Sequence, residues 1–325
     1  MTTTSVLRVA VVGLGHMGRR HAHVLRRLDG VRLVAAVDPA GDQHSAAPDV
    51  PVLADLDQLV KHGVDYAVLA VPTRLHEPLG LALAAAKIPT LVEKPLAPDV
   101  PGARRLVAAF ESAGVAAAVG YVERCNPALI ALRARIIDGL LGRITHVDTR
   151  RSGPYPAQGT DTGILTDLAT HDFDTTAWIT RQHYRSLKAL TGRRGPGHPR
   201  EDLAAVIGVL DDGTITYHAT SWLCPVPHRT TIVTGEHGSL IADTLTRELR
   251  YQRGNEIARY PLPNTEPLRT EHERFRDVVQ GRGPADVSLF DGLATVRATH
   301  AALEAARTGA AVALATDHTQ LNAIA

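Results

Sequence analysis

The chain has 325 residues, of which 44% are hydrophobic and 21% charged, so it is long enough for two domains and too apolar to be a disordered chain. Its 35 basic and 34 acidic residues leave a net charge of +1, which gives no basis for binding nucleic acid or a membrane surface by bulk attraction. No apolar stretch is long enough to span a bilayer, and the two cysteines have no metal-ligand spacing. These features predict a cytoplasmic protein without a metal, a membrane anchor or a nucleic-acid partner.

Residues 1–121 alternate short apolar segments with amphipathic ones, which is typical of a parallel sheet with helices on both faces. We expect strands over 7–12, 31–38, 64–72, 89–95 and 114–122. Helices are expected from the glycine-rich segment to about residue 28, over 75–87 and over 99–113. The pattern therefore predicts an α/β first domain with a doubly wound parallel sheet.

The segment GLGHMG, residues 13–18, follows the first expected strand directly and opens the first helix. Gly13 permits a tight turn, Gly15 lets the backbone approach a pyrophosphate, and Gly18 allows the helix to pack closely on the sheet. Asp38 ends the second strand, where a carboxylate accepts hydrogen bonds from ribose hydroxyls and repels a 2′-phosphate. The first domain is therefore predicted to be a Rossmann domain that binds NAD rather than NADP, although an Asp-Pro pair is also an ordinary turn opening.

The segment Glu93-Lys94-Pro95 ends the fourth expected strand, and ligands of open parallel sheets collect at these strand ends. The chain contains 31 arginines and only four lysines, so a site that needs only positive charge would favour arginine. Lysine differs because it is a compact donor to a single oxygen and can lose its proton when buried. Lys94 is therefore a candidate catalytic residue, and the alternative is a surface cation near a turn.

Residues 164–181 are expected to form a helix that places Asp167 and His171 four positions apart on one face. A carboxylate at this separation can hold an imidazole in one orientation and adjust its proton affinity, as a general base requires. The alternative is a solvent-exposed ion pair, because Asp172 and Asp174 make the same helix acidic.

Residues 122–325 are expected to form a second domain in which strands dominate. We expect these strands over 184–192, 203–210, 214–222, 229–236 and 238–243, separated by Asp-Gly, Pro or Gly turns. Two helices, over 267–281 and 289–308, close the chain, and residues 192–202 are expected to be an exposed loop.

Four segments occur in one order along the chain: VVGLGHMG at 11–18, AVPTRLHEP at 70–78, VEKPLA at 92–97 and DLATHDFD at 167–174. In these segments the chain resembles the Gfo/Idh/MocA oxidoreductase family over nearly its whole length. The resemblance implies an α+β C-terminal domain with a large open, mostly antiparallel sheet, which is also the usual surface of homodimers or homotetramers. It further implies the catalytic set Lys94, Asp167 and His171. The implied cofactor contacts are Gly13, Gly15, His16, Met17, Gly18, Asp38, Pro72, Thr73, His76, Glu93 and Lys94.

Three further segments are similar to the branch of this family that oxidises the C3 hydroxyl of nucleotide-linked sugars. They are YVERCNPAL at 121–129, RRSGPYP at 150–156 and TSWLCPVPHRTTIVTGEHG at 220–238. Arg150 and Arg151 beside a Gly-Pro-Tyr-Pro turn suit a diphosphate, and Tyr155 suits stacking on a base or sugar. The substrate contacts expected from this similarity are Tyr121, Glu123, Asn126, Arg150, Arg151 and Tyr155.

Together, these features predict an NAD-dependent dehydrogenase that oxidises a secondary alcohol of a nucleotide-linked sugar or a nucleotide. His171 would take the hydroxyl proton, and Lys94 would donate a hydrogen bond to the developing alkoxide. Because hydride transfer is reversible and uses the same residues, an NADH-dependent keto-sugar reductase or an inositol (cyclitol) dehydrogenase is the alternative. A dinucleotide-binding regulator without catalysis is a further alternative, against which the intact catalytic set argues.

Overall fold

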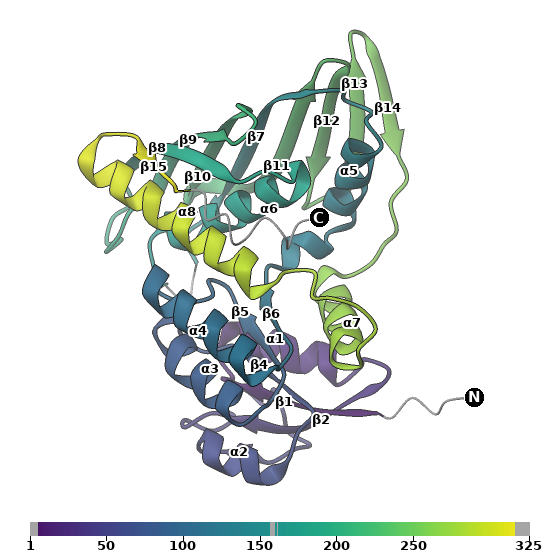
Figure 1. Cartoon of the computed structure of the whole chain (residues 1–325), viewed down its shortest axis with the longest axis vertical. Coiled ribbons are helices and arrows are strands. Elements are labelled where there is room, and N and C mark those ends of the chain that lie inside the picture. Colours follow the sequence, from purple (N-terminus) through teal and green to yellow (C-terminus); the bar gives the residue numbers. More distant parts are fainter. Residues whose placement is uncertain (1–5, 157–159, 161, 316–325) are drawn as a thin grey trace. The chain divides into compact units, whose positions relative to one another are not determined.

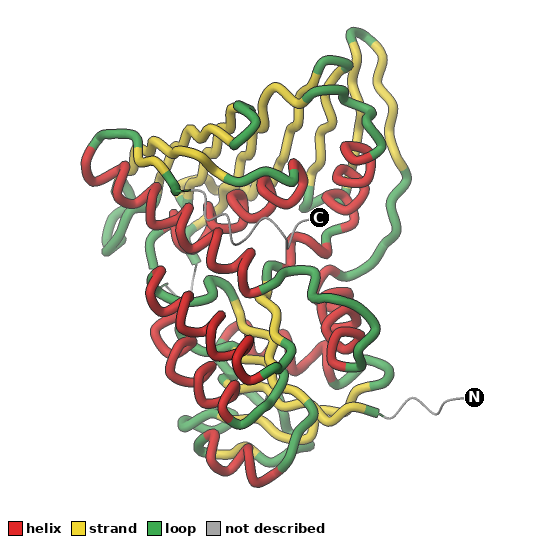
Figure 2. The backbone as a smooth tube through the Cα atoms, viewed as in Figure 1, coloured by secondary structure: helices red, strands yellow, loops and turns green. Residues whose placement is uncertain are grey.

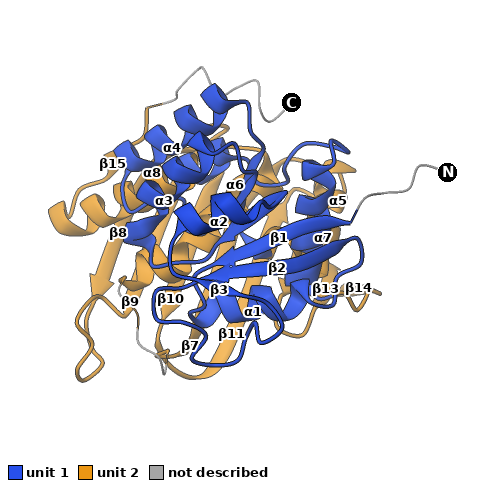
Figure 3. Cartoon of the chain, turned by 90° about the horizontal axis from the view of Figure 1, so that it is seen from below, with its two compact units in different colours: residues 1–122, 266–293 blue, residues 123–265, 294–325 orange. Residues whose placement is uncertain are grey.

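The structure is a computed structural model that describes residues 6–156, 160 and 162–315. The chain divides into two compact units, which Figure 3 colours separately. Unit 1 contains Met1–Val122 and Glu266–Leu293, and unit 2 contains Glu123–Thr265 and Ala294–Ala325. Residues 266–293, which the sequence placed in the second domain, thus pack within the first. One reason is aromatic packing, because the ring of Phe275 meets the buried ring of Tyr66 edge to face with centroids 5.5 Å apart.

Unit 1 is built on a six-stranded parallel sheet in the order β3-β2-β1-β4-β5-β6 (Figure 1). Its strands are β1 (Leu7–Val12), β2 (Val31–Val37), β3 (Val52–Leu53), β4 (Tyr66–Leu69), β5 (Thr90–Glu93) and β6 (Ala117–Gly120). The β-branched, apolar sequence of β1 suits a strand that is covered on both faces. The strand order reverses between β1 and β4, and the crevice at the carboxyl ends of such strands is where dinucleotides bind.

Helices and 3₁₀ turns connect the strands of this sheet. They are α1 (His16–Leu25), α2 (Leu56–His62), η1 (Thr73–Leu75), α3 (His76–Ala85) and α4 (Val100–Ala113). The later helix α7 (Pro267–Val279) connects none of these strands and packs against α1. The sequence predicted no element over residues 52–62, where β3 and α2 lie. The start of α2 nevertheless carries a recognisable signal, because the Asp55 carboxylate accepts the Gln58 N–H at 2.9 Å as an N-cap.

Unit 2 contains a nine-stranded sheet in the order β14-β13-β12-β11-β7-β10-β9-β8-β15, in which only the β10–β7 pair is parallel. Its strands are β7 (Ile144–Pro154), β8 (Tyr184–Gly192), β9 (Leu203–Leu210), β10 (Ile215–Ser221), β11 (Leu223–Gly235), β12 (Gly238–Asp243), β13 (Glu248–Arg253), β14 (Glu256–Tyr260) and β15 (Val312–Ala313). A parallel six-stranded sheet and a separate, mostly antiparallel sheet confirm the predicted fold class.

Helices cover one face of the nine-stranded sheet, as the separation of red and yellow segments in Figure 2 shows. They are α5 (Pro127–Ile137), α6 (Thr170–Thr180) and the later part of α8 (Leu289–Thr308), and the 3₁₀ turn η2 (Val122–Cys125) precedes α5. The opposite face carries Leu190, Ile207 and Tyr217, whose side chains are exposed. None of the described helices is long and apolar enough to cross a membrane.

Candidate active site

The glycine-rich segment forms a tight turn between β1 and α1. Gly13 has a φ of +91°, and a Cβ there would stand 2.5 Å from the carbonyl oxygen of Ala70. A Cβ at Gly18 would overlap the carbonyl oxygen of Gly13. Both positions therefore require glycine, because any side chain would push the turn away from the sheet.

The N-terminus of α1 faces open space. Gly15 occupies the N-cap position without a side-chain cap, and nothing lies within 4 Å of the place where its Cβ would be. His16 is exposed, Met17 is half-buried, and the first turn has no acidic residue. The backbone N–H groups of this turn and the positive end of the helix dipole are thus available to an anion such as a pyrophosphate.

Asp38 lies just beyond β2 and is bonded to the glycine-rich turn. Its Oδ2 accepts the N–H of Leu14 at 2.8 Å, and its Oδ1 accepts the N–H of Ala40 at 2.9 Å. The carboxylate therefore opens a turn, as one of the two sequence interpretations has it, and also contacts the glycine-rich turn. An ionised carboxylate has about four acceptor positions, which leaves room for a ribose hydroxyl.

Two predicted cofactor contacts follow β4, and a third is enclosed. Pro72 is exposed and Thr73 is half-buried. His76, in contrast, is 1% exposed, and its two ring nitrogens lie 2.8 and 2.9 Å from the carbonyl oxygens of Pro95 and Val71. The ring of His76 therefore joins the loop after β4 to the turn after β5, which differs from the direct cofactor contact expected for it.

Lys94 is half-buried at the end of β5, while Glu93 beside it points into the interior. The Glu93 carboxylate lies 2.9 Å from Nε2 of His21, and its other oxygen accepts the backbone N–H of Lys94 at 3.0 Å. Burial raises the pKa of this carboxyl, but the hydrogen bond to His21 and the nearby charges of His21 and Lys94 outweigh it and leave the pKa lowered. Glu93 is thus a buried carboxylate behind Lys94 and not an exposed cofactor ligand.

Asp167 and His171 lie in unit 2 at the junction of a π-helical turn and an α-helix. The turn η3 covers Leu165–Ala169, α6 begins at Thr170, and both side chains are half-buried. The sequence predicted one uninterrupted helix here. A π turn accommodates an extra residue in the helix and re-aims the side chains around it, a distortion that is frequent at functional sites.

Two other acids of α6 point inward and are held by arginines. Asp174 receives two hydrogen bonds from Arg124, at 2.6 and 2.9 Å. Asp172 lies 3.1 Å from Nε of Arg151, whose NH1 donates to Glu123 at 2.8 Å. Burial raises the pKa of Asp172 to about 6 against the opposing effect of Arg151. The acidic helix suggested by the sequence is therefore anchored inside the unit and is not a solvated face.

The structure separates the two arginines that were predicted to hold a diphosphate. They are neighbours on β7, so their side chains point to opposite faces of the sheet. Arg150 is exposed on the open face, whereas Arg151 is 6% exposed and bonded to the two acids of the helical face. The pair cannot contact one diphosphate together.

The remaining predicted substrate contacts are mostly enclosed. Tyr121 and Glu123 are buried, and Asn126 caps α5 by accepting the Ala128 N–H while donating to the Thr244 carbonyl. The half-buried Tyr155 stacks on His198 of the loop 192–202.

Residues 192–202 form a mostly exposed loop, as expected from the sequence, and one buried acid anchors it. Asp202 accepts the N–H groups of Arg194 and Gly195 and lies 2.7 Å from Nδ1 of His198. The His198 ring in turn stacks on Tyr155 with centroids 3.9 Å apart.

The sequence analysis did not single out His21, which is fully buried on α1. A signal was present, because Gly18, His21, Ala22 and Leu25 recur at the spacing of one buried helical face. A histidine on an otherwise apolar face needs a polar partner, and here that partner is Glu93.

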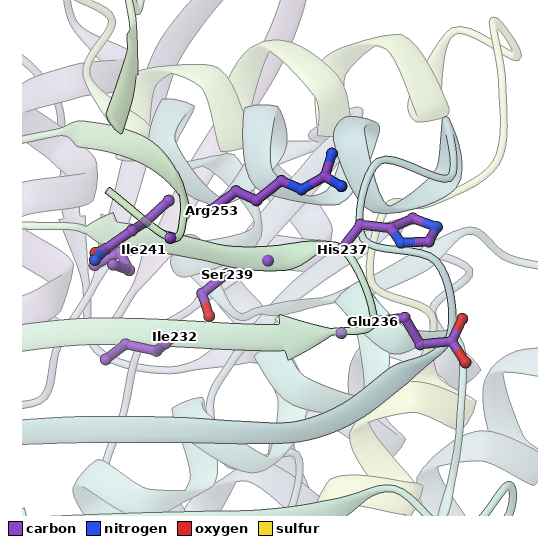
Figure 4. Close-up of a pocket in the computed structure, with 10 residues that line it drawn as sticks. Ile232, Glu236, His237, Ser239, Ile241 and Arg253 are labelled. Atoms are coloured by element: carbon purple, nitrogen blue, oxygen red, sulfur yellow. The ribbon is translucent and has the colours of Figure 1, made fainter. Parts of the chain in front are cut away.

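A hollow near the β11–β12 turn of unit 2 contains none of the predicted site residues (Figure 4). Its lining includes Ile232, Glu236, His237, Ser239, Ile241 and Arg253. The Glu236 carboxylate is already bonded to the backbone and guanidinium N–H groups of Arg143. Because the hollow contains none of the predicted site residues, a substitution in its lining serves as a control for substitutions in the predicted site.

Two family profiles match the chain. The one described as an oxidoreductase family with an NAD-binding Rossmann fold matches residues 7–121, and the GFO/IDH/MocA C-terminal domain matches residues 129–241. Inositol 2-dehydrogenase 4 of Saccharopolyspora erythraea is 31% identical over an alignment of 327 positions, which covers 94% of each chain.

Two solved structures are similar over nearly their whole length. GenD2 from gentamicin A biosynthesis, in complex with NAD, is 27% identical with a TM-score of 0.85, and the match covers 96% of this chain and 97% of GenD2. UDP-N-acetylglucosamine 3-dehydrogenase GnnA from Acidithiobacillus ferrooxidans is 22% identical with a TM-score of 0.85, covering 93% of this chain and 98% of GnnA. At that identity, the likeness to GnnA shows a shared fold.

Proposed function

Because the chain belongs to the Gfo/Idh/MocA family of NAD-binding oxidoreductases, we propose that it oxidises a secondary alcohol of a cyclitol such as an inositol. The observation that carries this substrate class is the 31% identity to an inositol 2-dehydrogenase over 94% of both chains. The sequence placed this class second, behind nucleotide-linked sugars, and the relatives reverse that order.

The first domain binds NAD, and the residues around its glycine-rich turn fit this cofactor. Gly15 leaves space at the N-terminus of α1 for a pyrophosphate, and Asp38 keeps acceptor positions for ribose hydroxyls. When bound, NAD supplies the nicotinamide ring that accepts the hydride from the alcohol carbon. The negative charge of Asp38 favours NAD over NADP, because it repels a 2′-phosphate.

His171 is proposed to remove the hydroxyl proton of the substrate. Its ring is half-buried, and a neutral imidazole accepts a proton near pH 7. Asp167 orients this imidazole or the substrate. Lys94 donates a hydrogen bond to the alcohol oxygen and so stabilises the negative charge that develops there.

A nucleotide-linked sugar, or the ribose 3′-hydroxyl of a free nucleotide, is the second candidate substrate. It is supported by the segments at 121–129 and 150–156. It ranks second because the guanidinium of Arg151 is already bonded to Glu123 and Asp172. Of the two arginines predicted to hold a diphosphate, only Arg150 therefore remains available to a phosphate. Reduction of a keto-sugar would use the same residues in the reverse direction.

We also propose that copies of the chain associate through the open face of the nine-stranded sheet as homodimers or homotetramers. Leu190, Ile207 and Tyr217 are exposed there, and a contiguous apolar surface of this kind marks an interaction site. The molar mass in solution, measured by light scattering, tests this association.

The substrate proposal is tested by following NADH formation with a panel of inositols, monosaccharides, UDP-sugars and nucleotides. We expect turnover with an inositol and NAD. Turnover with a UDP-sugar or nucleotide alone would establish the second candidate. Tight NAD binding without turnover on any member, in either direction, would indicate a regulator instead.

His171→Ala tests the proposed base on the best substrate of that panel. We expect turnover to fall about 10²- to 10⁴-fold, while the Kd for NAD stays within about twofold of the wild-type value. The matched control is His237→Ala, at the exposed position labelled in Figure 4, which should leave both quantities unchanged. A parallel loss of NAD affinity would remove His171 from this role.

A further inference from the structure

A buried group of titratable side chains lies behind Lys94 within unit 1. It comprises His21 on α1, Glu93 at the end of β5 and His272 on α7, and we call it the His21 cluster. Both histidines are 0% exposed and Glu93 is 6% exposed. Nδ1 of His21 lies 2.9 Å from Nε2 of His272, and Nε2 of His21 lies 2.9 Å from Oε1 of Glu93. The three side chains therefore form one continuous hydrogen-bonded chain.

The contacts limit where the protons of the cluster can lie. The Glu93 carboxylate only accepts hydrogen bonds, so Nε2 of His21 must donate to it. Between the two imidazoles, one of the facing nitrogens donates and the other accepts. Burial holds the pKa of His272 well below its usual range, so this ring is neutral. The negative charge of the cluster thus resides on Glu93, next to Lys94.

Glu93 links this cluster to Lys94 and to the cofactor-binding end of the unit. One carboxylate oxygen contacts His21, and the other accepts the backbone N–H of Lys94 at 3.0 Å. His21 lies on α1, the helix whose N-terminus carries the glycine-rich turn. A single carboxylate therefore connects the dinucleotide-binding helix with the residue proposed to contact the substrate oxygen.

A buried, ionised carboxylate joins α1 to β5 less favourably than apolar packing would, because the carboxylate loses its contacts with water. Placing a carboxylate in the interior costs several kcal/mol, and well-packed apolar side chains of similar volume often serve stability at least as well. α1 already packs through apolar residues such as Ala22 and Leu25, which are buried in the core of this unit. The polar connection is thus additional to a packing contact that exists without it.

We propose that Glu93, oriented by His21 and His272, is a positioning residue that holds Lys94 at the place and in the charge environment that the reaction requires. This inference rests on the proposed role of Lys94. It assigns a function to α7 as well, because the chain passes through unit 2 and returns to unit 1 to supply His272.

The decisive experiment is a double-mutant cycle with Glu93→Gln, Lys94→Ala and the double variant, assayed on the best substrate of the panel. Loss of one charged hydrogen-bond partner is worth about a tenfold change, so Glu93→Gln should lower kcat about tenfold with the Kd for NAD within about twofold. In the Lys94→Ala background, the same change should lower kcat less than about twofold. Equal effects in both backgrounds would overturn the inference, since Glu93 would then act independently of Lys94.

A second measurement reads the environment of Lys94 without any substrate. The chain has only four lysines, and the other three, Lys61, Lys87 and Lys188, are exposed. In protein labelled with ¹³C at the lysine ε-carbon, the resonance missing from Lys94→Ala identifies Lys94. We expect Glu93→Gln and His21→Asn to move this resonance and to leave the other three in place.

Glu77→Gln is the matched control, because it removes a carboxylate from an ion pair with Arg105 outside the cluster. It should leave kcat and the Lys94 resonance unchanged. An unmoved Lys94 resonance in both cluster variants would refute the inference. If Glu93→Gln does not fold, His21→Asn and Glu93→Asp provide the same comparison. Full activity in Lys94→Ala would instead remove Lys94 from the proposed mechanism, while the resonance still reports the contact between Glu93 and Lys94.

Discussion

Each unit buries a group of ionisable side chains that includes the sequence neighbour of a predicted catalytic residue, and the two groups use different chemistry. The His21 cluster of unit 1 joins a carboxylate to imidazoles. In unit 2, the Arg151 cluster, formed by Arg151, Glu123 and Asp172, joins two carboxylates to a guanidinium. A guanidinium stays charged at every accessible pH, whereas an imidazole does not. Unit 2 thus holds its helix with a permanent charge, while unit 1 places a buried carboxylate, bonded to an imidazole, at the backbone N–H of Lys94.

The largest effect is expected when the permanent charge is removed. Arg151→Ala leaves Glu123 and Asp172 buried without their common partner, which should cost about 3–5 kcal/mol of the free energy of unfolding. Urea unfolding followed by circular dichroism measures this loss. The Kd for NAD should stay within about twofold, because the NAD-binding domain keeps its own core.

Arg150→Ala is the control for that variant, since Arg150 is the next residue on the same strand and is exposed on the opposite face. It should change the free energy of unfolding by less than about 0.5 kcal/mol. Equal destabilisation by both substitutions would show that the contact of Arg151 with Asp172 on α6 contributes no particular stability.

An intermediate effect, dependent on pH, is expected at Glu271 on α7. This side chain is buried, and its Oε2 has no hydrogen-bond partner in the described part of the chain. Burial, with the charges of Glu93 and Asp286, raises its pKa well above the usual value. The folded chain therefore keeps a proton that the unfolded chain loses, so this group reduces stability as pH rises above about 4.5.

Glu271→Gln should abolish the decrease in stability above pH 4.5, because the glutamine amide does not ionise. Relative to wild type, the variant should gain about 1–3 kcal/mol in the free energy of unfolding between pH 4.5 and 7.5. Unfolding curves at the two pH values measure the change. Glu273→Gln, at a partly exposed position on the same helix, is the control and should produce no such gain. A constant difference at both pH values would contradict the prediction.

The smallest effect is expected at His272, and it has the opposite sign. Burial lowers the pKa of this ring, so below about pH 6.5 the unfolded chain binds a proton that the folded chain does not. Wild-type stability therefore falls as pH decreases from 6.5. The glutamine of His272→Gln takes up no proton, so this loss of stability is absent. As pH falls from 7 to 5, the free energy of unfolding of the variant should therefore rise by about 1–2 kcal/mol relative to that of the wild type. If the difference in the free energy of unfolding between variant and wild type stays constant over this interval, the ring takes up its proton as readily in the folded chain as in the unfolded one.

The sequence predicted most of unit 1 because its local signals agree with its fold. The apolar β-branched run of β1, the three glycines after it and the cap of α4 by Asp99 each specify a local structure. In unit 2, β13 and β14 were not predicted, because β13 is short with only Leu249 fully buried and β14 has no buried residue, so neither carries a strong apolar pattern. Their strand structure comes from pairing with their neighbours.

The site was predicted unevenly for a related reason. Motifs identified Lys94, Asp167 and His171 as candidates, but sequence neighbours suggested a pair, Arg150 and Arg151, that the strand sends to opposite faces. His76 stood in a recognisable motif, yet its ring joins two loops in the interior.

The sequence by itself determined the glycine-rich turn, most of the first domain's strands and helices, and the family with its cofactor. Those features depend on residues close together in the chain, where backbone sterics and side-chain periodicity act directly. Only the tertiary structure decided that Glu93 bonds to His21, that His272 returns from 251 positions further along to complete the cluster, and that Arg151 is enclosed. Such contacts join distant residues, and burial and hydrogen bonding fix them only after the chain has folded.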